Sequence, residues 1–231
     1  MGKLSIAKFN QDLLPDVIVI VGGNTPVATE DAIVSKYNIV SRVEKIFHYY
    51  ELSYDQKNVG LVFGVYGAAM VIDLLHYLKD GACKKVVFIG YAFSRDVEWI
   101  NKLVLVQEAL SVDGVTGDSR NPATYYPMQS LYAEVKSILV QGEHNFAEDK
   151  VSSGSSVFYK DDQARVLMQE HSHLVDMEVG SVFFTANMLS LSAAALLLVN
   201  ETNEVKIHHS SGAKEQFLPN VVASLLTHYL A

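Results

Sequence analysis

Three short runs of apolar residues, each followed by a glycine, place the strongest constraint on how this chain folds. The runs are Val17–Val21, Leu61–Phe63 and Val86–Ile89, and the glycines that follow them are Gly22, Gly64 and Gly90. An apolar run without alternation is typical of a strand that is covered on both faces. The runs therefore predict a buried parallel or mixed sheet, whose turns at residues 22–25, 64–67 and 90–94 lie at one edge. Open α/β sheets bind their ligands at such an edge.

Helical patterns separate these predicted strands. Apolar residues recur with helical spacing in Ala68–Lys79, and Thr25 followed by Pro26 is typical of a helix start. The later segments that we predict are the helices Ser130–Leu139, Glu178–Leu189 and Gln216–Leu230 and the buried strand Ala193–Val199. Strand and helix alternate without a linker or a low-complexity stretch. The sequence thus predicts one α/β domain over residues 1–231, with a mixed central β-sheet flanked by helices.

Composition excludes several classes of protein. A hydrophobic fraction of 49% in 231 residues is enough for a sizeable core, and the single Cys83 excludes a disulfide framework. The net charge of −8 argues against nucleic acid as the main partner. No apolar run approaches the roughly 20 residues of a membrane helix, and we expect a cytoplasmic protein without a membrane partner. The pairs His171/His173 and His208/His209 lack accompanying carboxylate or cysteine ligands, so no metal site is expected.

Short motifs also follow one another in a recognisable order. They are Val19–Asn24, Phe63–Ala69, Ile72–Ala82, Val86–Gly90, Val112–Gly114, Phe158–Tyr159, Val175–Glu178 and Leu197–Glu204. This order resembles that of the nucleoside phosphorylase family, which includes uridine phosphorylases and the trimeric or hexameric purine nucleoside phosphorylases. The Asp-Met-Glu that ends at Glu178 is the most telling motif. The resemblance implies a single α/β domain, assembled as dimers that pair into rings up to hexamers, in which neighbouring subunits complete one another's sites.

The resemblance also implies a ligand and the residues that bind it. The ligand is a nucleoside, with inorganic phosphate as co-substrate and no cofactor. Glu178 corresponds to the residue that accepts hydrogen bonds from two ribose hydroxyls, Met177 to the residue that packs on the sugar, and Phe158 to the aromatic that stacks on the base. Asn200 and Glu201 correspond to the catalytic strand end on the base side. A glutamate there acts as a general acid if burial raises its pKa.

The phosphate site of the family is eroded in this chain. Its remnants are Gly23, Asn24, Gly90 and Tyr91, with asparagine in place of an aspartate and tyrosine in place of a threonine or serine. Val27 and Phe88 stand where the family has arginines, and Arg42 is the one arginine left near the segment that is donated to a neighbouring subunit. A hydrogen bond to a charged group contributes about 1.5–3 kcal/mol. Losing two or three of them would remove most of the affinity for phosphate.

Three functions remain open at the level of sequence. The first is phosphorolysis of the N-glycosidic bond of a nucleoside, in nucleoside salvage. The second is hydrolysis of that bond, for which apolar residues at positions 27 and 88 suit a water nucleophile and Glu30 is the candidate base. The third is a non-catalytic relative that binds a nucleoside or serves as a structural subunit beside an active paralogue, in a hetero-oligomer rather than a homo-oligomer.

Overall fold

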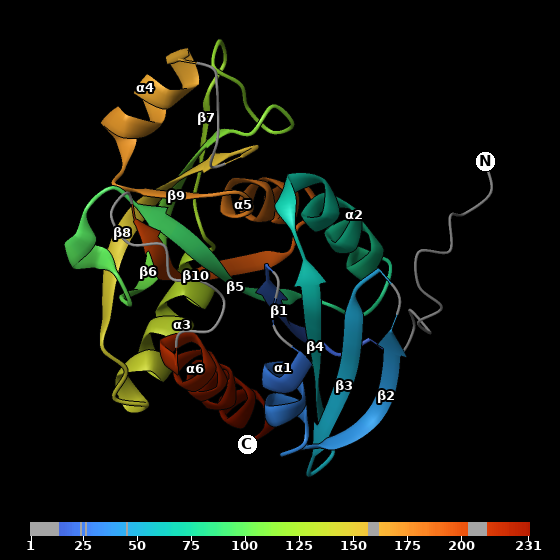
Figure 1. The fold of residues 1–231 in the computed structure, drawn as a ribbon. Helices are drawn as coiled ribbons and strands as arrows, with labels where there is room; N and C mark the ends of the chain where they lie inside the picture. The colour runs from blue at the N-terminus through green and yellow to red at the C-terminus, as the bar shows by residue number, and fades with distance from the viewer. Residues whose placement is uncertain (1–13, 24, 26, 45, 157–161, 203–211) are drawn as a thin grey trace.

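The structure is a computed structural model that describes residues 14–23, 25, 27–44, 46–156, 162–202 and 212–231 (Figure 1). Its strands are β1 (Val17–Gly22), β2 (Asn38–Glu44), β3 (His48–Tyr54), β4 (Lys57–Val65), β5 (Lys85–Ser94), β6 (Leu103–Val112), β7 (Ala123–Tyr125), β8 (Phe146–Gly154), β9 (Leu174–Asp176) and β10 (Ser192–Thr202). Its helices are α1 (Val27–Val34), α2 (Gly67–Lys79), α3 (Gln129–Gln141), α4 (Asp162–His171), α5 (Val179–Met188) and α6 (Gly212–Leu230), with the short 3₁₀ helix η2 (Val97–Trp99).

One mixed sheet of ten strands organises the chain. The order is β10-β6-β8-β9-β5-β1-β4-β3-β2, with β7 paired to β6. Strand β10 also pairs in parallel with β5, so β5, β10, β6, β8 and β9 close into a ring, while β1, β4, β3 and β2 extend from it as an open sheet. Strand β1 lies between β4 and β5 and is parallel to both. It therefore occupies the buried centre that its uninterrupted apolar run predicts.

Helices cover the sheet on both faces. Helices α2 and α5 lie together on one face, where Leu74 of α2 and Phe183 of α5 join a core cluster with Ile18 and Ile20 of β1. Helices α1, α3 and α6 supply the cluster on the other face, which takes the alternate β1 residues, such as Val19. Helix α4 packs separately against the far end of β6 (Figure 1). The single-domain α/β fold with a mixed sheet is thus confirmed.

The alternation of strand and helix is less regular than the sequence predicts. Strands β2, β3 and β4 follow one another as an antiparallel meander, with no helix between them. The expected turn at residues 90–94 is also wrong, because β5 continues to Ser94. Gly90 lies inside that strand, where a Cβ would come within 2.5 Å of the Phe88 ring. The glycine therefore makes room for a neighbouring side chain and does not end the strand.

Candidate functional site

The loops that follow β1 and β4 meet the start of α5 at one edge of the sheet. The backbone N–H of Gly23 donates to the carbonyl of Val65 at 2.8 Å, which joins the first two loops. The N–H of Gly67 donates to Oε1 of Glu178 at 2.7 Å, which joins the β4 loop to α5. Three segments that lie far apart in the sequence therefore form one contiguous edge. Two of the three predicted turns, at residues 22–25 and 64–67, belong to it.

Glu178 is a deeply buried acid at this edge. It occupies the N-cap position of α5, and 5% of its surface is exposed. Burial raises the pKa of Glu178 above its ordinary value and the Asp176 carboxylate raises it further, whereas the backbone N–H groups of Gly67 and Met177 lower it. The carboxylate is thus fixed by main-chain donors in a site of low dielectric. In such a site, ionising the carboxyl group costs more free energy than it does in water.

Asp176 holds the backbone that positions Glu178. Its Oδ2 accepts hydrogen bonds from the N–H groups of Glu178 at 3.1 Å and Val179 at 2.7 Å, and its Oδ1 accepts one from Ser153 Oγ at 2.5 Å. Ser153 Oγ in turn accepts from the N–H of Gly180 at 2.8 Å. These contacts satisfy amides of the first turn of α5 that have no partner inside the helix. Burial raises the pKa of Asp176, and the three donors partly offset the rise.

An exposed aromatic residue that the sequence analysis does not single out covers Met177. Tyr66 precedes α2, is 58% exposed, and its hydroxyl donates to Sδ of Met177 at 3.6 Å. A tyrosine face and a thioether together form an apolar surface beside the Glu178 carboxylate. Such a surface suits the unsubstituted face of a sugar or the plane of a base. The position of Tyr66 within the glycine-rich Phe63–Ala69 motif is the signal that could have identified it.

The described residues that the resemblance assigns to phosphate binding are packed against other protein groups. Phe88 is fully buried, and its ring lies so close to Gly22 that a Cβ there would come within 2.5 Å of it. The ring of Tyr91 packs in the same way beneath Gly23, which has a φ of +77°. The Gly23 N–H is already bound to Val65, so it does not point at a free anion site. Asn24 lies outside the described residues.

Arg42, the arginine that the sequence analysis retains as a candidate, is engaged with other side chains. Both Nε and Nη2 of Arg42 donate to the Glu44 carboxylate, and the guanidinium lies 5.2 Å from the centre of the Tyr50 ring. The Arg42 side chain is 51% exposed, on edge strand β2. Two further arginines are also engaged, Arg95 by the carbonyls of Gln169 and Ser172 near the end of α4 and Arg165 by Asp162.

We expect Arg42→Gln to leave the affinity for inorganic phosphate and the urea midpoint of unfolding unchanged. The reason is that an exposed guanidinium already paired with Glu44 contributes little to either. Isothermal titration with phosphate and urea unfolding of both proteins check this. A tenfold loss of phosphate affinity in the variant would show that Arg42 is a phosphate ligand after all.

Asn200 and Glu201 lie at the end of β10, where a bulge interrupts the pairing with β5. Asn200 is buried and Glu201 is half-buried. Phe93 of β5 pairs with Glu201 on one side and with Val175 on the other. Neighbouring strands lie about 4.8 Å apart, so Glu201 is roughly 10 Å from the Asp-Met-Glu segment along this row. Phe158 lies outside the described residues.

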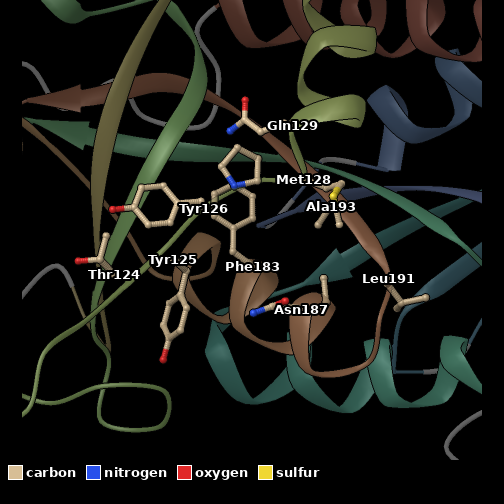
Figure 2. A pocket seen from close by; sticks show the side chains of 11 residues that line it. Thr124, Tyr125, Tyr126, Met128, Gln129, Phe183, Asn187, Leu191 and Ala193 are labelled. Atoms are coloured by element: carbon tan, nitrogen blue, oxygen red, sulfur yellow. The ribbon is translucent and has the colours of Figure 1, made fainter.

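A cavity of about 310 Å³ lies at the opposite end of α5 (Figure 2). Its lining includes Phe183 and Asn187 of α5, Met128 before α3, and Leu191, and Figure 2 shows the Asn187 side chain between those of Phe183 and Leu191 in this view. None of the described residues predicted for ribose or phosphate binding lines it. It is therefore a hollow separate from the edge that carries Glu178.

Metal-binding groups do not gather in the described part of the chain, where no three His, Cys, Asp or Glu side chains come together. His171 lies near Glu108 and His173 pairs with Asp96, while residues 208 and 209 are outside the described ranges. Cys83 is buried, and burial raises the pKa of its thiol to about 12. This thiol is therefore uncharged and unreactive near neutral pH. Among the described helices, none is long and apolar enough to span a membrane.

The mixed sheet with helices on both faces is the fold of a known α/β family. The model of the phosphorylase superfamily matches residues 17–228, and the chain belongs to that family. No curated protein matches the sequence.

Solved structures of the same fold include both hydrolases and phosphorylases. A futalosine hydrolase mutant of Helicobacter pylori strain 26695 has a TM-score of 0.73 at 16% identity, over 92% of this chain and 99% of that one. The purine nucleoside phosphorylase of Toxoplasma gondii in complex with immucillin-H has a TM-score of 0.73 at 12% identity, over 91% and 90%. The uridine phosphorylase of Vibrio fischeri ES114 has a TM-score of 0.72 at 16% identity, over 92% and 90%.

Proposed function

We propose that this protein binds a nucleoside through its ribose and cleaves the N-glycosidic bond with water as the nucleophile. The observation that carries the proposal is the Glu178 carboxylate, which is buried at the sheet edge and fixed there by the Gly67 N–H. An anion beside the ribose accepts hydrogen bonds from its hydroxyls. It also stabilises the positive charge that develops on the sugar as the bond to the base breaks.

The packing of the residues assigned to phosphate binding supports water as the nucleophile. A phosphate dianion needs fixed cations or free N–H groups. Phe88, which the resemblance aligns with a family arginine, is fully buried, and the Gly23 N–H donates to Val65. Water needs neither group. Hydrolysis therefore fits these residues better than phosphorolysis, which remains the competing reaction because the phosphorylases share the fold.

The other candidate residues are proposed to contact the sugar or the base. Met177, with Tyr66 over it, supplies the apolar surface for the sugar or base. Glu201 is the proposed proton donor to the departing base, with Asn200 beside it. Phe158 is the proposed stacking partner of the base. No cofactor takes part in this scheme.

Base release with and without phosphate tests the proposal. The purified chain is incubated with purine and pyrimidine ribonucleosides in phosphate-free buffer and in the same buffer with added inorganic phosphate. Free base and free ribose are then separated and quantified. Release of both without phosphate supports hydrolysis. Release only with phosphate, yielding ribose 1-phosphate, would assign phosphorolysis instead. Thermal stabilisation by a nucleoside without any base release would assign a non-catalytic binding protein.

Self-association remains a prediction, as does pairing with a paralogue. Exposed apolar side chains near the sheet edge include Val27, Ile46 and Tyr66, which are 64%, 62% and 58% exposed. Apolar groups that gather on one surface favour a partner subunit. Sedimentation equilibrium of the pure chain gives the solution mass, and a monomer at micromolar concentration would contradict a site shared between identical subunits.

A further inference from the structure

A histidine held by a buried carboxylate lies near the glycine loop. Glu30 belongs to the first turn of α1 and is 3% exposed, and His48 is the first residue of β3. Nδ1 of His48 lies 2.9 Å and 3.1 Å from the two carboxylate oxygens of Glu30. The Tyr50 hydroxyl donates to Oε1 of Glu30 at 2.5 Å. A glutamate buried this deeply requires such donors, so the three side chains form one unit.

The carboxylate of this unit is already occupied. Oε1 of Glu30 accepts the hydrogen bond of the Tyr50 hydroxyl, and both oxygens face Nδ1 of His48. Burial, the hydrogen bond to Glu30 and the Glu44 charge raise the pKa of Tyr50. The Arg42 charge lowers this pKa, but by less than the other groups together raise it, so the phenol stays a donor. Glu30, the candidate base of the sequence analysis, is therefore poorly placed to accept a proton from water itself.

His48, unlike Glu30, has an atom that can accept a proton from water. With Nδ1–H donating to Glu30, Nε2 carries the lone pair, and within the described ranges no hydrogen-bond partner of Nε2 is found. The side chain is 38% exposed, so Nε2 can reach solvent. A carboxylate that fixes the tautomer of an imidazole and stabilises its protonated form is the arrangement that makes histidine a general base. The charged groups facing this unit are Glu30 from α1 and Glu44 and Arg42 from β2.

The register of the sheet places His48 beside the candidate site. His48 pairs with Phe63 of β4, and Phe63 pairs with Val21, which directly precedes Gly22 and Gly23. The main chain at Phe47 lies 3.8 Å from the position of a Cβ on Gly64, in the loop that leads to Gly67 and so to Glu178. Two strand spacings, roughly 10 Å, separate the backbone of His48 from β1. The His48 ring, held by Glu30 of α1, therefore lies two strands from the loop that carries Gly22 and Gly23.

We propose that His48 is the general base that activates the attacking water, and that Glu30 is its positioning residue. This rests on the proposed hydrolysis. In the step, the water oxygen bonds to C1′ while the C1′–N bond breaks and its electron pair goes to the base nitrogen. One water proton passes to Nε2 of His48, and the base nitrogen gains a proton from Glu201. The products are free ribose and free base.

The decisive variant is His48→Asn, because the asparagine amide can still donate to Glu30 in place of Nδ1–H while Nε2 is removed. We expect kcat for base release to fall about 100-fold to 1,000-fold with KM changed less than about threefold, since general-base catalysis contributes on this order. His48→Ala should regain part of its rate when imidazole is added to the buffer. Glu30→Gln should lower kcat with KM little changed, because the amide no longer supplies the negative charge that faces the imidazole.

The matched control is His173→Gln, which removes an exposed histidine that also pairs with a carboxylate, Asp96, through Nδ1 at 2.8 Å. It should keep wild-type kcat. If His48→Asn also keeps wild-type kcat while Glu178→Gln loses activity, the role of His48 is overturned and the proposed hydrolysis stands. If the wild-type protein releases no base in phosphate-free buffer, both fall. A low kcat in His48→Asn with no imidazole rescue of His48→Ala would assign His48 a structural role and overturn the inference.

Discussion

Replacing Glu178 by glutamine is expected to lower the rate of base release roughly 30-fold to 1,000-fold. The amide keeps the size of the side chain but removes the charge from the two hydrogen bonds that we propose Glu178 accepts from ribose. Hydrogen bonds to a charged group are worth about 1.5–3 kcal/mol each, so a loss of about 2–4 kcal/mol is expected. A dideoxynucleoside, which lacks the same hydroxyls, should be a poor substrate for the wild-type protein. It should be no poorer for the variant, because the two changes remove the same contacts.

The same residue links nucleoside binding to pH. Since the folded-state pKa of Glu178 is raised, the anionic form needed for two strong hydrogen bonds becomes populated only as the pH rises through that raised value. Nucleoside affinity should therefore increase with pH in the wild-type protein. The stability of the folded protein should instead decrease as the pH rises. A carboxyl whose folded pKa is raised contributes stability below its unfolded value, about 4.3, and loses it as the pH rises through the folded value.

The pH dependence of nucleoside affinity and the pH dependence of stability should both become weaker in Glu178→Gln, because this variant has no carboxyl group to titrate at position 178. Binding is measured by titration of the nucleoside at several pH values, and stability by urea unfolding over the same range. Glu98→Gln on the exposed η2 turn is the matched control and should retain the wild-type slopes. Equal nucleoside affinity in the wild-type protein and in Glu178→Gln at every pH would refute the assignment of this carboxylate to ribose.

The centre of the fold was predictable because its signals are local. The Val17–Val21 run is buried on both faces, and the structure places it as β1 between two parallel neighbours. Helix α2 also follows its periodicity closely. The Leu103–Val106 run within β6 is as apolar as these, although the predicted strands do not include it. Strand β2 is different. It lies at the edge, and its exposed residues show no alternation that would mark a strand.

The candidate site was less predictable, because its contacts depend on pairs that are distant in the sequence. Glu178 could be proposed from its motif, but its bond to the Gly67 N–H joins residues 111 positions apart. The pairing of Glu30 with His48 depends on β3 returning antiparallel beside β4, and that meander was not predicted. Phe88 illustrates the reverse case. Its position in an apolar run already indicated core, and the structure adds that its ring presses on Gly22 and Gly90.

Replacing Asp176 by alanine should cause a large loss of stability, about 3–5 kcal/mol in the free energy of unfolding. Asp176 is 2% exposed, and its removal leaves three buried donors without an acceptor: the N–H groups of Glu178 and Val179 and the Ser153 hydroxyl. Each unsatisfied buried donor costs about 1–3 kcal/mol, reduced where relaxation or water supplies a partner. Asp176→Asn keeps one acceptor oxygen and should lose less.

Asp118→Ala is the control that separates burial from hydrogen bonding. Oδ1 of Asp118 also accepts two backbone N–H groups, those of Arg120 at 2.7 Å and Asn121 at 2.9 Å, but in an exposed turn. Water replaces the carboxylate there, so a loss of about 1 kcal/mol or less is expected. Urea unfolding of the three variants gives the comparison. Equal losses for Asp118→Ala and Asp176→Ala would mean that the start of α5 is not held by its buried carboxylate. The fixed position of Glu178 would then need another cause.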